Sequence, residues 1–283
     1  MLRVVSINGR LLPMREARVS VAEGAFLYGE GIFETVRLYD GRPLLLQSHL
    51  ERASAGAKLL GLKLPPGRTL EREIARLVAA NRVRGDAVGR ITLSRAPSSR
   101  RVAAARATRV LILRSLPDDL ARQYERGIRV RTLPFERAVG PAAAIKHLSY
   151  LPSILALRAA DLAGAAEALF LSPGGQVLEG ATTNLYACID NTLLTPPADG
   201  RILPGVVRRH LFSLGGEGLP PIKEAPISRA DLDRASEVFL TNAVREIVPV
   251  VRIDARPVGG GLPGPATRAA QMAWRAFVAG LAG

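Results

Sequence analysis

The chain has 283 residues, of which 48% are hydrophobic and 23% are charged. This length is enough for one large or two medium domains, and the composition is that of a folded protein rather than a disordered one. No apolar run is long enough to cross a bilayer and arginines interrupt the first twenty residues, so we expect neither a membrane span nor a signal peptide. The single cysteine, Cys188, fits a reducing compartment, and we expect a cytoplasmic protein with no membrane partner.

The formal net charge of +14 would suggest nucleic-acid binding in a small basic domain. Here the cationic residues are scattered along the chain, and aromatic residues do not alternate with them as base-stacking surfaces require. We therefore expect no nucleic-acid partner. Chemistry that needs a lysine is easy to localise, because the chain has only four: Lys58, Lys63, Lys146 and Lys223.

The first half of the chain mixes strands with helices. Residues 1–47 are predicted mainly as strand and turn, and Asp40-Gly41 between two apolar runs indicates a hairpin. Residues 48–61 show helical spacing, and Thr69 is placed to cap a second helix. Two short β-rich runs follow, and the polar stretch at residues 117–127 is the expected linker.

The second half repeats this mixture. A strand is followed by a predicted helix at residues 150–164, a β meander with a Gly174-Gly175 turn, and a short helix after Pro204-Gly205. A further β-rich stretch and a C-terminal helix complete the chain. Strands and helices do not alternate in a βαβ rhythm, which favours the α+β class over a doubly wound sheet.

Lys146 is the lysine with the most distinctive surroundings. It lies in the segment AAAIKHLSYLPSIL, with no carboxylate nearby in sequence. An apolar setting favours the neutral amine, which can attack a carbonyl carbon. The alternative is a structural lysine whose stem packs while its head reaches solvent. Lys58, Lys63 and Lys223 have the surroundings of surface residues.

Several segments, in order, resemble one known family: FLYGEGIFETVRLYDG, HLERA, IKHLSYLPSILALRA, VLEGATTNLY, ILPGVVRRHL and LTNAVREIVPV. Together they are similar to class-IV aminotransferases, the fold-type IV enzymes that use pyridoxal 5'-phosphate (PLP). This family includes branched-chain aminotransferases, D-amino-acid aminotransferases and aminodeoxychorismate lyases. The resemblance implies a small N-terminal α/β lobe at residues 1–118 and a larger, barrel-like, PLP-binding lobe at residues 119–283. It also implies that the cofactor lies between the lobes and that the protein is a homodimer.

The resemblance assigns cofactor roles to residues of both lobes. Lys146 would hold PLP as a Schiff base, Glu179 would bind the pyridine nitrogen, and Tyr150 would lie near the 3'-oxygen. A carboxylate keeps the pyridine nitrogen protonated, so the ring can accept electrons from the substrate. The residues that would bind the phosphate are Arg52, the helix start Gly205, Val206 and Val207, and the loop Thr241, Asn242 and Ala243.

Some of these residues also have simple structural interpretations. Glu179 could be a surface carboxylate at the end of a strand, and Arg52 could lie on a solvated helix face. The loop at Thr241 could be an ordinary turn between strands. His49, close to Arg52 in sequence, is expected to be a packed structural histidine rather than a catalyst.

Five residues are candidates for substrate binding. By the resemblance, Tyr28 and Phe33 occupy positions that line the pocket in branched-chain enzymes, while Arg37 and Arg90 match inward-facing positions. Either arginine could bind the substrate carboxylate through a bidentate fork. Arg100 corresponds to part of the D-enzymes' carboxylate site, but Val102 stands where those enzymes have a histidine, which counts against a standard D-specific site.

We expect the reaction to be transamination between a branched-chain-like or other small amino donor and a 2-oxo acid, with no metal. The alternative is 4-amino-4-deoxychorismate lyase activity, which releases pyruvate and p-aminobenzoate. The short KHLS loop after the lysine favours this alternative, because it is more like the lyases and D-enzymes. A third possibility is a cofactor-free relative that serves in assembly or nucleic-acid binding. The intact set of cofactor residues argues against it.

Overall fold

The computed structural model of the protein describes residues 3–97, 107–135, 140–215 and 218–282. The chain divides into two compact units. The first unit comprises Met1–Pro117 and Ile145–Tyr150, and the second comprises Asp118–Ala144 and Leu151–Gly283. Within the described ranges, no helix is both long and apolar enough to cross a membrane.

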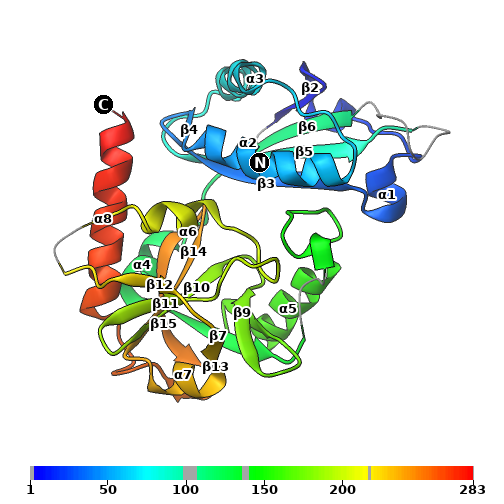
Figure 1. Cartoon of the computed structure of the whole chain (residues 1–283). Helices are drawn as coiled ribbons and strands as arrows, with labels where there is room; N and C mark the ends of the chain where they lie inside the picture. The colour runs from blue at the N-terminus through cyan, green and yellow to red at the C-terminus, as the bar shows by residue number, and fades with distance from the viewer. Residues whose placement is uncertain (1–2, 98–106, 136–139, 216–217, 283) are drawn as a thin grey trace. The chain divides into compact units, whose positions relative to one another are not determined.

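The first unit is built on an antiparallel sheet (Figure 1). Among its described residues, six strands lie in the order β2-β1-β6-β5-β3-β4. Their bounds are β1 Val4–Ile7, β2 Arg10–Pro13, β3 Gly31–Tyr39, β4 Arg42–Pro43, β5 Ala87–Arg95 and β6 Ala107–Arg114. The helices of this unit are η1 Met14–Glu16, α1 Gly24–Tyr28, α2 Leu46–Leu59 and α3 Gly67–Ala80.

The turn between β3 and β4 is the hairpin that the sequence predicts. Asp40 and Gly41 both have positive φ, 45° and 79°, the combination that a type I′ turn requires. Tyr39 pairs with Arg42 across the turn. The predicted helix at residues 48–61 is α2, which begins and ends two residues earlier. The start of α3 differs from the prediction, because the helix begins after Pro66 and Thr69 lies inside its first turn.

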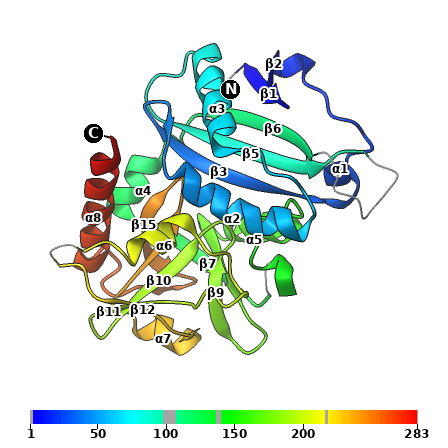
Figure 2. The same ribbon diagram turned by 45° about the horizontal axis from the view of Figure 1, so that its top comes forward.

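Helices α2 and α3 cover one face of the first sheet (Figure 2). Side chains alternate along β3, so Val36 and Leu38 face the helices while Phe33, Thr35 and Arg37 face the opposite side. The buried core of this unit joins the sheet to both helices; it includes Val36, Leu38, Leu46, Leu70, Ile74, Leu77, Ile91, Leu111 and Leu113. One face of the sheet therefore packs into the core of this unit, and the other face carries polar and aromatic side chains.

Residues 145–150 extend the first sheet at the edge of β3. The Leu148 N–H donates to the Gly31 carbonyl and the Phe33 N–H donates to the Lys146 carbonyl, each at 2.9 Å. Ile32 and His147 form an antiparallel bridge between these bonds. This return of the chain to the first unit was not foreseen, because local sequence patterns do not report pairing over such a distance. The segment that contains Lys146 is therefore held like an added strand.

The second unit contains a larger mixed sheet. In its described residues the strand order is β12-β11-β10-β14-β15-β7-β8-β9-β13, and β16 pairs with β15. The strands are β7 Ile128–Leu133, β8 Glu167–Leu171, β9 Gln176–Gly180, β10 Asn184–Ile189, β11 Thr192–Thr195, β12 Ile222–Glu224, β13 Ile227–Ser228, β14 Glu237–Asn242, β15 Glu246–Ile253 and β16 Arg256–Pro257. The helices are α4 Leu120–Arg126, η2 Gly140–Ala142, α5 Leu151–Leu162, α6 Val206–Leu211, α7 Arg229–Arg234 and α8 Pro265–Ala282.

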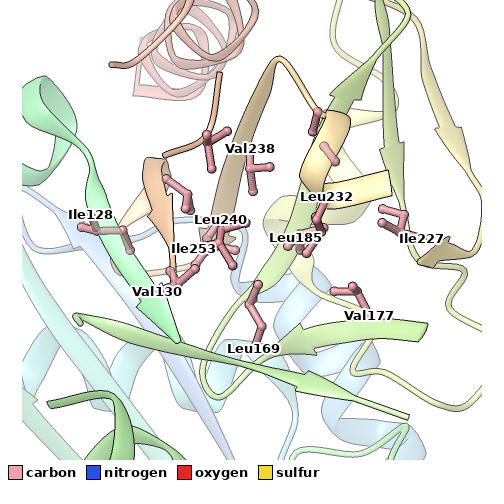
Figure 3. Close-up of a cluster of buried hydrophobic side chains, with 14 of the residues drawn as sticks. Ile128, Val130, Leu169, Val177, Leu185, Ile227, Leu232, Val238, Leu240 and Ile253 are labelled. Carbon is pink, nitrogen blue, oxygen red and sulfur yellow. The ribbon is translucent and has the colours of Figure 1, made fainter. Parts of the chain in front are cut away.

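This sheet curls around a core of aliphatic side chains (Figure 3). Val130, Leu169, Leu185 and Leu240 come from four different strands and point toward one another. On β14, Val238 and Leu240 face this core, while the Phe239 ring between them stacks on Tyr186 on the other face. Most strand pairs are antiparallel, and β7-α5-β8 is a parallel crossover. The predicted α+β class with a barrel-like second lobe is confirmed.

The stretch predicted as a linker at residues 117–127 is in fact largely a helix, α4. Its Leu120 side chain is buried, and the Tyr124 hydroxyl donates to the Glu246 carboxylate at 2.8 Å. The same carboxylate accepts from the indole of Trp274 on α8 at 3.1 Å. The prediction was wrong because these tertiary anchors outweigh a polar local composition. Helices α4 and α8 both pack on β15.

A substitution at Gly31 tests how closely residues 145–150, which contain Lys146, pack against β3. A Cβ atom at this position would come within 2.5 Å of both the Leu148 side chain and the Leu93 carbonyl oxygen. We expect Gly31→Ala to lower the free energy of unfolding by about 1–3 kcal/mol, as overpacking does elsewhere. Urea unfolding would measure the change. Gly280→Ala in α8 is the control, because nothing lies within 4 Å of its added Cβ. An equal effect of the two substitutions would contradict close docking.

Candidate active site

Three of the predicted site residues in the first unit gather around the Phe33 ring. The ring is almost fully buried, at 4% exposure. Lys146 Nζ lies 4.5 Å from the ring centre, and Arg90 Cζ lies 3.7 Å from it. The Tyr150 ring meets Phe33 edge-on, with 5.4 Å between the ring centres. The structure thus brings the predicted lysine, tyrosine and one predicted arginine to a single aromatic side chain.

The sheet register explains this cluster. Phe33 on β3 is opposite Thr92 on β5, and Arg90 is opposite Thr35. Phe33 and Arg90 are therefore diagonal neighbours on the face of the sheet away from α2 and α3, within reach of long side chains. Lys146 reaches the same ring because its own carbonyl is bonded to the Phe33 N–H.

Lys146 differs from the other lysines in its exposure. Its side chain is partly buried against Phe33, whereas Lys58, Lys63 and Lys223 are exposed. The expectation that these three are surface residues agrees with the structure. Nothing in the geometry assigns the chemical role of Lys146 by itself, so that role stays a prediction.

The two candidate arginines have different surroundings. Arg37 donates to the Asp86 carboxylate from Nη2 at 2.8 Å and from Nε at 3.3 Å, and it lies over the Tyr39 ring. Arg90 has no carboxylate partner among the described residues. Burial lowers the pKa of Arg90; the nearby Tyr150 acts against this effect, and the charge of Arg114 adds to it. Arg90 is thus a partly desolvated cation that lacks a carboxylate partner in the described chain.

Arg52 is on helix α2, which covers the other face of the sheet. It donates to the Glu34 carboxylate from Nε at 2.9 Å and from Nη2 at 2.6 Å, and its side chain is only 10% exposed. His49 Nδ1 lies 2.8 Å from the same carboxylate. The interpretation of Arg52 as a solvated surface residue is therefore wrong, and His49 is the packed histidine that was expected.

The titration of this buried triad follows from its charges. Burial by itself would raise the pKa of Glu34, but the Arg52 charge and the hydrogen bonds from His49 and Arg52 outweigh it and lower the pKa to about 2. Burial lowers the pKa of His49, against the opposing effect of Glu34. A neutral His49 must carry its proton on Nδ1 to donate to the carboxylate. The triad is therefore an ion pair of Glu34 and Arg52 with a neutral histidine.

In the second unit, Glu179 is a buried carboxylate on β9. It is 4% exposed, accepts the Leu203 N–H at 3.0 Å, and has the Asn184 amide at 3.4 Å. That amide also donates to the Leu203 carbonyl at 2.9 Å. The interpretation of Glu179 as a surface carboxylate is wrong. Asn184 was not selected from the sequence, although it lies in the quoted segment VLEGATTNLY.

The predicted phosphate-binding residues of this unit lie around Asn184. Helix α6 begins after Gly205, as predicted, and a Cβ on Gly205 would overlap the Asn184 amide oxygen. Val206 and Val207 form the first turn of that helix. Thr241 pairs with Asn184 across β14 and β10, and its buried hydroxyl has no hydrogen-bond partner in the part of the chain that the structure describes.

The loop after Thr241 is held by side chains that the sequence did not single out. The Asn242 side-chain oxygen accepts the N–H groups of Val244 and Arg245 at 2.9 and 2.7 Å. Arg245 donates to the fully buried Glu167 carboxylate at 2.5 Å, and that carboxylate also accepts from the Thr182 hydroxyl. Ala243 lies in this turn without a side-chain donor of its own. Asn242 therefore shapes the loop, and Glu167 anchors it through Arg245.

These groups fit PLP when each unit is considered separately. The first unit provides a lysine beside aromatic rings. The second provides a buried carboxylate that suits a protonated pyridine nitrogen, a hydroxyl without a partner in the described residues, and the N-terminus of a helix that follows Gly205. The chemistry of the donors is therefore that of a PLP enzyme.

Tyr28 is a predicted substrate residue that does not join these groups. Tyr28 is on α1 and is 67% exposed in this chain. Arg100 lies outside the described residues, as does Val102, so the comparison with the D-enzymes' carboxylate site has no structural counterpart here. Glu23, just before α1, is a buried carboxylate that accepts from the Ser94 hydroxyl at 2.7 Å and holds this end of the unit to the sheet.

The chain matches the family described as amino-transferase class IV over residues 31–253. It is 33% identical over 271 residues, covering 93% of this chain and 92% of the relative, to a Methanocaldococcus jannaschii protein provisionally named a branched-chain-amino-acid aminotransferase. It is 30% identical to D-alanine aminotransferase of Staphylococcus haemolyticus, with 97% of each chain covered. The structure of the branched-chain aminotransferase of Thermoproteus uzoniensis with norvaline matches with a TM-score of 0.88 at 29% identity, covering 98% of this chain and 95% of that one.

The chain therefore belongs to the class-IV aminotransferase family. It is a PLP-dependent enzyme that transfers an amino group between an amino acid and a 2-oxo acid. This confirms the predicted family, cofactor and type of reaction. The lyase alternative is not favoured, because the relatives named here are aminotransferases.

The Glu34 ion pair predicts how stability depends on pH. The pKa of Glu34 is lowered from 4.5 to about 2 on folding, so its contribution is fully present above about pH 4.5 and is lost as the pH falls toward 2. We expect Glu34→Gln to cost about 3–5 kcal/mol at neutral pH, because Arg52 is left without its carboxylate. The variant should also lose less stability than the wild type over that acidic range.

Urea unfolding of the wild type and the variant at several pH values would measure both effects. Asp199→Asn is the control, because it breaks the exposed Asp199–Arg201 pair and should cost less than about 1 kcal/mol. Similar costs for the two variants would mean that the Glu34 pair does not stabilise the fold.

Proposed function

We propose that this enzyme acts on amino acids with small or branched apolar side chains, that Lys146 is the cofactor lysine and that Arg90 binds the substrate carboxylate. One observation carries the proposal. Lys146 and Arg90 contact the same buried aromatic ring, and Arg90 has no carboxylate partner among the described residues. A partly desolvated cation of this kind is suited to an anionic ligand, since buried charges are normally paired.

When bound, PLP supplies an electron sink that stabilises negative charge on the substrate Cα. The protein's own residues would do the rest. Lys146 Nζ is proposed to take the proton from Cα and to return it at the end of the half-reaction. Glu179 is proposed to keep a proton on the pyridine nitrogen, a role that suits a buried carboxylate held by the Leu203 N–H.

Arg52 and the residues around α6 are proposed to bind the phosphate of the same cofactor. Glu34 and His49 fix the Arg52 guanidinium from two sides, which limits the entropy that this long side chain would lose on binding an anion. The Thr241 hydroxyl and the N–H groups after Gly205 suit phosphate oxygens.

The apolar side-chain preference rests on the surroundings of Lys146. Phe33 and Tyr150 meet edge to face there, and both present aromatic carbon. Norvaline, whose side chain is apolar, is bound in the related structure from Thermoproteus uzoniensis. A D-amino donor is the second candidate, because the Staphylococcus haemolyticus relative is a D-alanine aminotransferase.

We further propose that the protein is a homodimer in the cytoplasm. The segment from Val19 to Tyr28 exposes several large apolar side chains: Val19, Val21, Phe26, Leu27 and Tyr28. Such a group on one short segment is typical of a protein contact, and a second copy would also place Tyr28 in contact with protein.

The cytoplasmic location rests on the single Cys188, which is buried and reduced.

The first half-reaction, in which an amino donor converts the PLP form of the enzyme, tests the proposed reaction. The PLP form mixed with one amino donor and no acceptor should convert to pyridoxamine phosphate, with valine, leucine or norvaline faster than charged amino acids. L- and D-enantiomers and (R)-amines would be compared by absorbance. Lys146→Ala is the matched control and should slow the conversion roughly a thousandfold or more. If the PLP-loaded enzyme is converted by none of these donors, the proposal is wrong.

The carboxylate assignment is tested by replacing each candidate arginine. Arg90→Met should raise KM for amino and keto acids by about tenfold or more and leave the PLP content unchanged, because a charged hydrogen bond to the substrate is lost. Arg37→Met should change KM little and act mainly on stability, since Arg37 is paired with Asp86. The reverse pattern would assign recognition to Arg37.

A further inference from the structure

The Phe33 ring is the common contact of the groups around Lys146. Arg90 lies over the ring at 3.7 Å, and Lys146 Nζ lies 4.5 Å from the ring centre. The edge-on contact with Tyr150 and the backbone bond to the Lys146 carbonyl hold the ring itself. A buried side chain fixed in this way can fix others in turn.

Arg90 needs such support because no carboxylate in the described chain orients it. An arginine side chain has several rotatable bonds and loses considerable entropy when it is confined. The face of an aromatic ring attracts a guanidinium, and the attraction is stronger where water is excluded. Arg90 is itself only partly exposed, so water is partly excluded here.

A second arginine on the same strand pair makes a useful comparison. Arg37 also lies over an aromatic ring, that of Tyr39, at 4.6 Å. Its guanidinium is already oriented by two bonds to Asp86. The Tyr39 ring is therefore not needed to aim Arg37, whereas the Phe33 ring is the only aromatic face that Arg90 meets among the described residues.

We propose that Phe33 is a positioning residue for substrate recognition, whose ring face holds Arg90 ready for the substrate carboxylate beside Lys146. This inference rests on the proposed role of Arg90. In this role Phe33 orients Arg90, whereas the sequence resemblance predicts that it lines the pocket for the substrate side chain. The ring sets where the carboxylate is held relative to the lysine amine, so it acts on affinity through Arg90.

The role predicts a specific kinetic pattern. Phe33→Leu keeps an apolar side chain but removes the ring face, so it should weaken carboxylate binding by about tenfold, the value expected for a desolvated cation–aromatic contact. KM for amino and keto acids should rise by a similar factor, with a smaller change in kcat. PLP content should be unchanged.

A double-mutant cycle on the PLP-loaded enzyme separates this role from simple contact with substrate. The dissociation constant of 4-methylpentanoate, a carboxylate with no amino group, is measured by calorimetry for the wild type, Phe33→Leu, Arg90→Met and the double variant. We expect Phe33→Leu to have little further effect once Arg90 is replaced, because the two residues act as one unit. Tyr39→Leu is the matched control and should leave the constant unchanged.

The outcomes are distinguishable. If Phe33→Leu weakens binding equally with and without Arg90, the ring contacts the substrate directly and the positioning role is wrong. If Arg90→Met binds 4-methylpentanoate like the wild type, the proposed function of Arg90 fails and the inference fails with it. If only Arg90→Met weakens binding, Arg90 keeps its role and Phe33 loses its own. Phe33→Met, which is closer to phenylalanine in volume, replaces Phe33→Leu should that variant not fold.

Discussion

The placement of Lys146 depends on the pairing of residues 145–150 with the edge of β3. Two backbone hydrogen bonds, at Gly31 and Phe33, fix this segment as an added strand. Backbone pairing defines position within a fraction of an ångström, which side-chain packing alone rarely does. The lysine therefore takes its location from a sheet of the first unit. The Phe33 ring, on the face of the sheet away from α2 and α3, contacts both Arg90 and Tyr150.

The two faces of that sheet differ in how their charged side chains are paired. The face beneath α2 and α3 carries aliphatic residues together with the buried Glu34–Arg52 pair, where every charge has a partner. The opposite face carries Arg90, a cation whose carboxylate partner has to come from outside the described chain. Partly buried charges of this kind cluster at functional sites. Arg37, on the adjacent strand β3, differs from Arg90 because its guanidinium is bonded to the Asp86 carboxylate.

The family, the fold class and the distinctive surroundings of Lys146 could be predicted from the sequence, because they depend on local patterns and on the motifs given above. The ranking of Arg37 and Arg90 could not, since Asp86 is distant in sequence from Arg37 and either arginine fits the same pattern. The burial of Glu179 and Arg52 depends on Leu203, Asn184 and Glu34, partners that only the tertiary structure brings near. Helix α4 was missed for the same reason, because Glu246 stabilises a segment whose composition resembles a linker.

The route of the chain through the two units has a consequence for engineering and for folding. The chain passes from the first unit to the second after residue 117, returns for residues 145–150, and leaves again. No single cut separates one unit from the other, so neither can be exchanged between enzymes as an intact module. The added strand is synthesised after residues 118–144, the first segment of the second unit, and before the rest of that unit. Completion of the first sheet is thus a long-range event of high contact order, which slows folding.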